Sequence, residues 1–482
     1  MKTLPITLAL LAAAGLITSG CSTAPNSADS SSAAHSSSDE ARAPRLSSDL
    51  RAEVFTDVTR AVLATDPAHL APAARFAVAE GLPLYENATD VPASLKELVT
   101  FGPTPAVGLP EGLKVTAGAS SAESADAPSL QHTDITSWQP GGDNSALAGF
   151  TVLVAPDTPV GQVAAAQAAG ARVLALPVAD PRATSESMAA VEAGNVIAVG
   201  PGFGSEADFA ARVEMVAAGE LPGGGGLVFP GRRMVALYGH PSGPALGVMG
   251  EQDPQAAVER VRALVEQYQP YSEEPVIPAF EVIATVASAS PGPDGDYSNE
   301  ADPAELQPYV DAIVNAGGYA VLDLQPGRAS LLEQAKLYED LLSHPNVGLA
   351  LDPEWKIGPD ELPMERIGHV EAAEVNEVAQ WLAALVREKG LPQKALVLHQ
   401  FQLQMLRDRS QIDTSAPELA FVLHADGHGP TGVKMETWNV LREGLHPDFF
   451  MAWKNFIDED EPMLDPAATY AVEPRPWFVS YQ

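Results

Sequence analysis

The sequence predicts an α/β protein with an N-terminal parallel-sheet α/β domain and a C-terminal (β/α)8 TIM-like barrel. Three observations lead to this fold class. Short apolar runs alternate with amphipathic helical segments through residues 231–482, which is typical of a parallel sheet with helical crossovers. Eight such runs fall in about 250 residues, the size of a (β/α)8 barrel. In the N-terminal half, two similar segments recur at a spacing of about 90 residues.

The eight predicted barrel strands are apolar runs too short for core helices. They cover residues 234–238, 279–285, 319–324, 347–351, 395–401, 420–424, 449–454 and 477–481. Helices are predicted between them at residues 253–268, 303–316, 329–343, 372–389 and 433–442. Proline in the first turn marks two of the helix starts, and Gly390 marks a helix end. We assign residues 231–482 to the barrel.

Residues 48–228 are predicted to form the N-terminal domain, which contains two degenerate repeats. Each repeat has the order strand, helix, strand, helix, strand, which implies parallel pairing with right-handed crossovers. The predicted strands are residues 61–66, 82–84 and 106–110 in the first repeat, and 151–155, 171–176 and 195–200 in the second. Between the repeats, residues 113–146 are rich in Gly, Ser and Ala, so we expect a mobile linker.

The N-terminus has the pattern of a bacterial lipoprotein signal. Lys2 precedes an apolar segment at 4–17, and small residues lead to Cys21, the one cysteine of the chain. This resembles a lipobox, which implies a signal peptide at 1–20, a lipidated Cys21 and a protein anchored to the extracytoplasmic face of the cell membrane. The alternative is an ordinary signal peptide with Cys21 as a bystander. Residues 21–47 contain almost no large apolar side chain and predict a disordered tether.

Composition excludes some functions. The formal net charge is −35, from 63 acidic and 28 basic residues, and such a surface repels phosphate backbones. We therefore expect no nucleic-acid partner. One cysteine allows no internal disulfide. After the signal segment, no apolar run reaches the length of about 18 residues that a membrane-spanning helix needs.

Polar side chains follow most of the predicted barrel strands. The carboxyl ends of barrel strands meet at one mouth, so these side chains are expected to surround a single site. The segment 347–351 is the clearest case, because it continues into Asp352-Pro353-Glu354. The candidate catalytic residues are the carboxylates Glu354, Asp352, Glu281, Asp323 and Asp426. The candidate substrate-binding residues are His240, Gln325, Arg328, Trp355, His399, Gln400, His424, Trp453, Lys454 and Asn455.

Structural roles are the alternatives for several of these residues. Glu281 could form an ion pair with Lys454 or Arg328 inside the barrel. Asp323, His399 and His424 could be satisfied polar groups of the core, and Trp355 and Trp453 could serve packing. His424, Asp426 and His428 match no strong metal-ligand spacing, so we expect neither a metal nor another cofactor.

Paired carboxylates with aromatic side chains in a barrel mouth favour carbohydrate chemistry. One protonated acid would donate to a glycosidic oxygen, and a second carboxylate would act as nucleophile or base. The sequence has no Gly-x-Ser-x-Gly elbow and no cysteine nucleophile in the barrel, which disfavours acyl transfer by those routes.

Two resemblances add to this interpretation. The N-terminal half resembles the cell-wall-binding repeat type 2 family in its order of strands and Ala-rich helices. The C-terminal half resembles an actinobacterial family of cell-envelope lipoproteins, labelled cell wall-binding repeat 2 family proteins, in five segments at residues 284–290, 294–299, 322–328, 351–355 and 453–456. The resemblance implies an envelope location and a glycoside-hydrolase-like barrel, and it supplies no catalytic residues.

The sequence thus leads to one principal hypothesis and two alternatives. The principal hypothesis is a membrane-anchored envelope lipoprotein whose barrel acts on cell-wall polysaccharide as a glycoside hydrolase. The first alternative is a non-catalytic protein that binds the cell wall or one of its glycans. The second is a structural lipoprotein with a relict barrel.

Overall fold

The computed structural model describes residues 42–105, 107–118 and 130–482. The predicted signal peptide at 1–20, the predicted lipidation site Cys21 and most of the predicted tether lie outside these ranges. Within the described ranges, no helix combines the length and the apolar character needed to cross a membrane.

The N-terminal half contains two parallel four-stranded sheets. The first has the order β3-β2-β4-β5, with strands β2 (Arg60–Leu63), β3 (Leu84–Tyr85), β4 (Glu97–Thr100) and β5 (Lys114–Ala117). The second has the order β1-β8-β6-β7, with strands β1 (Arg45–Ser47), β6 (Thr151–Val154), β7 (Arg172–Ala175) and β8 (Val196–Val199). The helices of this half are α1 (Leu50–Val54), α2 (Leu70–Glu80), α3 (His132–Thr136), α4 (Val160–Ala168), α5 (Ser185–Ala193) and α6 (Glu206–Glu214).

Three expectations for this half differ from the structure. The strand predicted at 106–110 is not seen in residues 107–110, where Gly108 has a φ of +92° and Pro110 cannot donate to a ladder. The third strand is β4 instead, whose Leu98 and Val99 are buried. The predicted linker 113–146 contains β5 and α3. The predicted tether extends to Ser47, yet Arg45–Ser47 form β1, because the edge of β8 supplies backbone partners.

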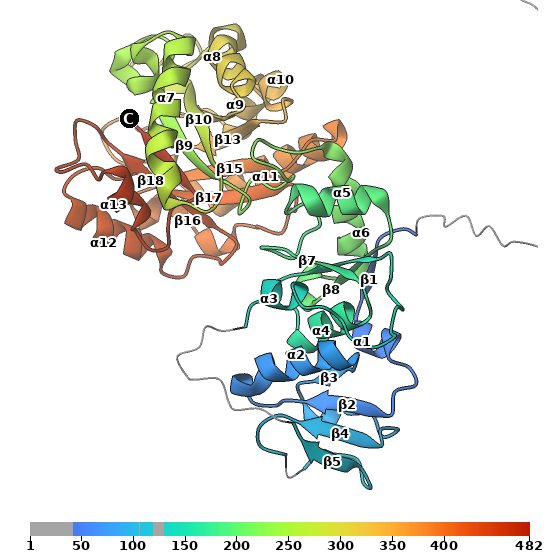
Figure 1. The fold of residues 1–482 in the computed structure, drawn as a ribbon. Helices are drawn as coiled ribbons and strands as arrows, with labels where there is room; N and C mark the ends of the chain where they lie inside the picture. The colour runs from blue at the N-terminus through green and yellow to red at the C-terminus, as the bar shows by residue number, and fades with distance from the viewer. Residues whose placement is uncertain (1–41, 106, 119–129) are drawn as a thin grey trace, which may run out of the picture. The chain divides into compact units, whose positions relative to one another are not determined.

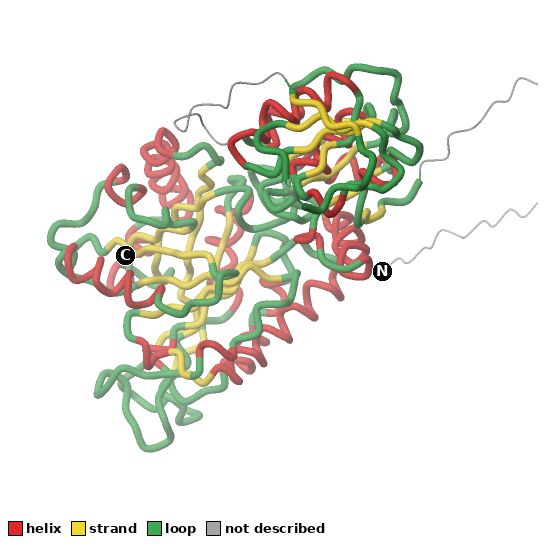
Figure 2. Tube along the Cα trace, turned by 90° about the horizontal axis from the view of Figure 1, so that it is seen from below, coloured by secondary structure: helices red, strands yellow, loops and turns green. Residues whose placement is uncertain are grey.

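All eight predicted barrel strands are present. They are β9 (Arg233–Gly239), β10 (Val276–Ala287), β12 (Tyr319–Leu324), β13 (Val347–Leu351), β15 (Lys394–Gln400), β17 (Leu419–Ala425), β18 (Phe450–Asn455) and β19 (Phe478–Tyr481). Neighbouring strands pair in parallel in this order, and β9 pairs with both β10 and β19. The sheet is therefore a closed barrel, and its strands run through the middle of the helices around them (Figure 2).

Helices connect most of the barrel strands, and Figure 1 shows α7 to α10 outside the strands. Their bounds are α7 (Pro254–Tyr268), α8 (Pro303–Asn315), α9 (Leu331–Leu337), α10 (Glu339–Leu342), α11 (Ala372–Lys389), α12 (Thr431–Arg442) and α13 (Pro466–Tyr470). The single helix predicted at 329–343 is thus divided into α9 and α10. The connection from β15 to β17 holds short turns and β16 (Leu406–Arg407), which pairs with β14 (Val370–Glu371). Strand β11 (Ser298–Glu300) pairs antiparallel with the end of β10.

The barrel interior is apolar at the amino ends of the strands and polar at the carboxyl ends. Side chains alternate between the interior and the helical layer with a period of two. Along β9 the interior series runs Met234, Ala236, Tyr238; along β17 it runs Ala420, Val422, His424. Leu221, Val228 and Phe229 join the apolar interior cluster, so the segment before β9 contributes to the barrel core.

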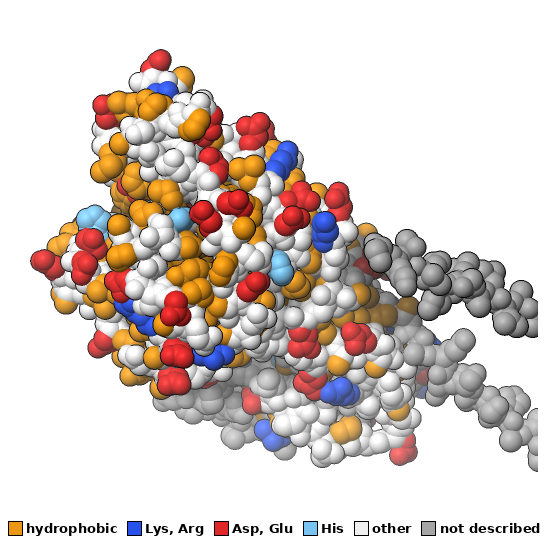
Figure 3. Space-filling view, turned by 90° about the horizontal axis from the view of Figure 1, so that it is seen from above, with side chains coloured by type: hydrophobic (Ala, Val, Ile, Leu, Met, Phe, Trp, Pro, Cys, Tyr) orange, Lys and Arg blue, Asp and Glu red, His pale blue; other side chains and the backbone are white. Residues whose placement is uncertain are grey.

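The acid excess of the composition is visible on the surface. On the face in Figure 3, acidic side chains outnumber basic ones, with hydrophobic side chains between them. This agrees with the formal charge of −35.

Candidate active site

A pocket of about 940 Å³ lies at the carboxyl ends of the barrel strands. Six of the predicted site residues line it: Asp352, Glu354, Trp355, Gln325, Asp426 and Lys454. Its walls also include apolar side chains of the connecting loops, among them Met364, Ile367 and Phe401. This is the position at which (β/α)8 barrels bind their ligands.

The sequence Asp352-Pro353-Glu354 positions two of the carboxylates. Pro353 ends the ladder of β13, and a short 3-10 turn, Pro353–Trp355, begins directly after Asp352. The side chain of Asp352 caps this turn, because its Oδ1 accepts a hydrogen bond from the Glu354 N–H at 3.1 Å. The turn carries Glu354 and Trp355 to the pocket wall, while Asp352 stays buried at the floor.

Beneath the pocket floor, His399 links two carboxylates. Its Nδ1 lies 2.8 Å from Asp426 Oδ2, and its Nε2 lies 2.9 Å from Glu281 Oε1. Its side chain and that of Glu281 are fully buried. Asp426 also lines the pocket, so this imidazole connects the pocket floor with the interior of the barrel.

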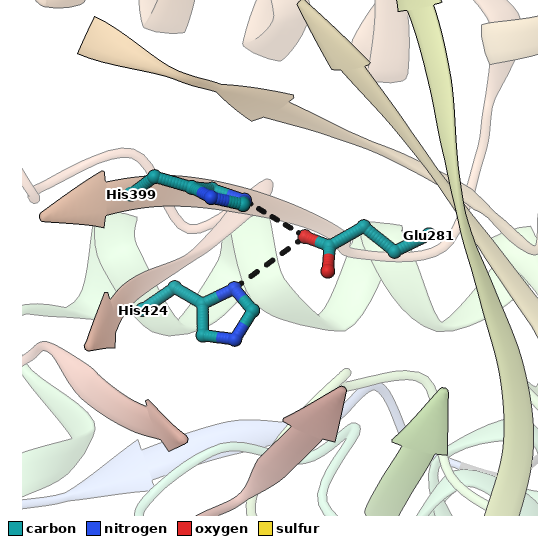
Figure 4. Close-up of side chains that lie close together, drawn as sticks. All are labelled: Glu281, His399 and His424. Atoms are coloured by element: carbon teal, nitrogen blue, oxygen red, sulfur yellow. Dashed lines mark hydrogen bonds and ion pairs between the residues drawn. The ribbon is translucent and has the colours of Figure 1, made fainter. Parts of the chain in front are cut away.

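The network continues from Glu281 to the opposite side of the barrel. His424 Nδ1 lies 3.5 Å from Glu281 Oε1, and Figure 4 shows the Glu281 carboxylate directed at both imidazoles. His424 Nε2 lies 3.1 Å from Ser480 Oγ on β19. Glu281 thus contacts two histidines rather than the predicted alternatives Lys454 and Arg328.

A second branch involves Tyr238, Asp323 and Lys454. Tyr238 donates its hydroxyl hydrogen to Asp323 Oδ2 at 2.8 Å, and Gln325 Nε2 donates to the same hydroxyl at 3.3 Å. The ammonium of Lys454 lies 3.6 Å from the centroid of the Tyr238 ring. Tyr238, Gln325 and Lys454 line the pocket, whereas Asp323 is fully buried below them.

Burial shifts the protonation of the pocket carboxylates. Burial raises the pKa of Glu354 to about 7, and the charge of Asp426 adds to the rise. Burial also raises the pKa of Asp352 well above its usual range, and it raises the pKa of Asp323. For Asp426, burial would raise the pKa, but the hydrogen bond and charge of His399 lower it.

The pKa values of the buried groups below the pocket depend on the charges of their neighbours. Burial would lower the pKa of His399, but the charges of Asp323 and Glu281 and its own hydrogen bonds raise it well above its usual range. Burial would raise the pKa of Glu281, but the adjacent imidazoles of His424 and His399 hold it well below. Burial lowers the pKa of His424. Without further ligands, His399 is therefore the cation of the interior network.

Three predicted binding residues hold loops and do not line the pocket. The His240 ring accepts a hydrogen bond at Nδ1 from the Ser242 N–H at 3.0 Å. Arg328 donates to the carbonyl of Glu361 at 2.8 Å. Gln400 donates to the carbonyls of Gln402 and Leu403, which fixes the loop after β15.

Trp453 and Asn455 also lie away from the pocket, because they alternate with Lys454 on β18. Trp453 packs against Trp438 of α12, with ring centroids 5.5 Å apart. Its Nε1 donates to Asn455 Oδ1 at 2.8 Å, and Asn455 donates to Thr469 at 3.3 Å. Both side chains therefore stabilise the layer between barrel and helices.

Two polar residues of the network were not singled out from the sequence. Tyr238 is the last residue of the first predicted strand, and Ser480 lies within the eighth. Every second residue of a barrel strand points into the interior, and Tyr238 and Ser480 occupy such interior positions after small or apolar residues. This alternation is the sequence signal that identifies them. The apolar residues Met364 and Ile367 come from the loop after Trp355, for which the sequence offers no periodicity.

Comparison with known proteins adds no assignment: no protein-family model matches the chain, and no curated protein matches it significantly. The fold and the site define an α/β protein with a closed parallel (β/α)8 barrel and a carboxylate-lined pocket at the carboxyl ends of its strands.

Proposed function

We propose that the barrel binds a glycan of the cell envelope and hydrolyses a glycosidic bond in it, with Glu354 as the general acid. The observation that carries this proposal is that Glu354 and Asp426 reach one pocket from the ends of two different strands. Glycoside hydrolysis needs one protonated acid and a second carboxylate on either side of the scissile bond. No cofactor is required for this chemistry.

The surroundings of Glu354 suit a proton donor, and those of Asp426 suit an ionised nucleophile or base. Glu354 lies against apolar loop residues, and a pKa of about 7 keeps much of it protonated at neutral pH. Asp426 accepts a hydrogen bond from His399, and its Oδ1 has no hydrogen-bond partner among the described residues. That oxygen is the natural candidate for nucleophile or base, and Asp352 is the alternative proton donor.

The remaining pocket residues suit a sugar. Trp355 and Phe401 offer aromatic faces, and Gln325 and Lys454 offer hydrogen-bond donors for hydroxyl groups. Met364 and Ile367 add apolar surface to the pocket wall. The pocket volume of about 940 Å³ lies at the upper end of the range of ligand pockets.

We propose the cell envelope as the location, with lipidated Cys21 as the membrane anchor and the wall glycan as the partner. The signal pattern of residues 1–21 and the family resemblance support this location. The same strand order in the two N-terminal sheets, second-first-third, supports an origin of this half in two diverged copies of a wall-binding repeat.

The test is hydrolysis of purified cell-wall polysaccharide by the mature protein, measured as released reducing ends. Glu354→Gln should reduce kcat by roughly 10²–10⁴-fold because the proton donor is lost. Asp426→Asn should cause a loss of similar size, and Glu365→Gln, an exposed acid of the same loop, serves as the matched control. Full activity of Glu354→Gln would refute the role of Glu354, and a loss confined to Asp352→Asn would transfer it to Asp352.

A non-catalytic glycan-binding function is the second candidate. The observation in its favour is that Glu281 and Asp323 lie below the floor and that Asp426 is engaged by His399. This function predicts that wild-type protein and Glu354→Gln bind wall glycan equally in calorimetry, and that neither releases reducing ends.

A further inference from the structure

Four acid and imidazole side chains lie close together inside the barrel, below the pocket floor. They come from four strands: Glu281 on β10, Asp323 on β12, His399 on β15 and His424 on β17. All four side chains are fully buried. One donor atom each from Glu281, His399 and His424 lies within 4.8 Å of the other two, and Figure 4 shows this arrangement.

Three donor atoms at this point have no hydrogen-bond partner among the described residues. They are Glu281 Oε2, Asp323 Oδ1 and His424 Nδ1. Buried polar atoms in proteins are almost always hydrogen-bonded, and each exception calls for a physical explanation. The three exceptions belong to side chains from β10, β12 and β17 that each lie close to His399, and a bound cation would accept electron pairs from donors of this kind.

The second nitrogen of each histidine has a partner. His399 Nδ1 lies 2.8 Å from Asp426 Oδ2, and His424 Nε2 lies 3.1 Å from Ser480 Oγ. Metal-binding histidines usually engage their second nitrogen in this way, which fixes the ring orientation and the coordinating nitrogen.

The geometry points to a divalent cation of the zinc class bound by Glu281, His399 and His424. The separations from Glu281 Oε1 are 2.9 Å to His399 Nε2 and 3.5 Å to His424 Nδ1. These values bracket the separation of about 3.3 Å between donors in a tetrahedral site with zinc bonds of roughly 2.0–2.1 Å. Two imidazoles and a carboxylate suit zinc better than magnesium or calcium, which prefer oxygen alone.

The cation takes the place of the proton that His399 Nε2 shares with Glu281, because a metal ligand must be deprotonated. All three ligands are fully buried below the pocket floor, so the site is structural. It ties three barrel strands together and, through the contact of His399 with Asp426, fixes one residue of the pocket. The proposal differs from the expectation of no metal, which rested on the spacing within 424–428, whereas these ligands come from three separate strands.

The test is zinc binding by the full mature chain after treatment with a chelator, measured by calorimetry and metal analysis without any glycan. We expect one equivalent of zinc per chain and a rise in Tm on binding. Cobalt in place of zinc should give the intense visible absorption of tetrahedral coordination. Substoichiometric binding by the folded wild-type protein, or the weak spectrum of octahedral cobalt, would overturn the proposal.

Variants locate the site. Glu281→Gln and His424→Gln should lose roughly 100-fold or more in zinc affinity, and Ser480→Ala roughly 10-fold, because it orients His424. Asp352→Asn and His428→Gln, which alter the pocket above, should bind as the wild type does. The opposite result, with affinity kept in Glu281→Gln and lost in Asp352→Asn, would contradict this site. Circular dichroism identifies variants that do not fold, and the wild-type cobalt spectrum tests the proposal independently of any variant.

Discussion

At the scale of residues, three neighbouring carboxylates acquire different properties from their contacts. Asp352 is buried and caps the turn that follows β13, whereas Glu354, two residues later, lies at the pocket wall. Asp426 faces the same pocket from β17 and is the one of the three that contacts an imidazole. Their positions in the sequence do not show which of the three carboxylates is protonated. The burial of each carboxylate and the charges beside it do.

The raised pKa of Glu354 predicts the pH dependence of hydrolysis. A general acid works only while protonated, so kcat/KM should fall roughly tenfold per pH unit above 7 as the Glu354 carboxyl of the free protein loses its proton. A pH–rate profile on wall polysaccharide measures this fall. If the fall instead begins near pH 4.5, the ordinary value of glutamate, then Glu354 is not the acid.

The location of the site was predictable from single residues, but its inner geometry was not. Polar residues at the ends of apolar strands identified the mouth, and six of them line the pocket. A parallel barrel buries both faces of each strand, so an apolar pattern cannot tell the interior face from the face toward the helices. For this reason the sequence predicts a common role for Trp453, Lys454 and Asn455, although the alternation of β18 places Lys454 on the opposite face from the other two.

At the scale of elements, the barrel strands were predictable because each is a continuous apolar run that ends at a polar residue. The N-terminal strands gave weaker signals. Strand β4, with the sequence Glu-Leu-Val-Thr, alternates poorly, while 106–110 is more apolar yet carries Gly108 and Pro110. Short strand β1 has no intrinsic signal and depends on the edge of β8 for its backbone hydrogen bonds.

Close packing between strands predicts the cost of one added methyl group. A Cβ on Gly348 of β13 would lie 2.8 Å from the Ala395 carbonyl oxygen and 3.0 Å from Tyr319 Oη. Gly348→Ala should therefore lower the free energy of unfolding by about 1–3 kcal/mol. Urea denaturation measures the change.

The matched control is Gly432 in α12, around which an added Cβ meets no atom within 4 Å. Gly432→Ala should be neutral or should stabilise by up to about 1 kcal/mol, because alanine favours the helix. Equal effects of the two substitutions would show that the packing between β13 and β15 is looser than described.

At the scale of the whole molecule, the predicted anchor and the acidic surface have separate consequences. The formal charge of −35 keeps the protein soluble and repels other polyanions. The anchor that we propose is the lipidated Cys21, and its removal has a measurable consequence.

Cys21→Ser should therefore move the protein from the membrane fraction to the soluble fraction of the producing cell. Two or more acyl chains give stable attachment, whereas a serine at this position accepts none. Fractionation and labelling with a radioactive fatty acid measure the change. A wild-type protein that is already soluble, or a variant that stays with the membrane, would contradict lipid anchoring at this residue.

The closing strand has a consequence for biogenesis. Strand β19 seals the ring between β18 and β9, and its Ser480 completes the interior network. Ribosomes make this strand after the other seven, so for most of translation the nascent chain has an open sheet with two unpaired edges. We expect export factors or chaperones to shield those edges until residue 481 has emerged, and the pocket to form in a single late step after synthesis.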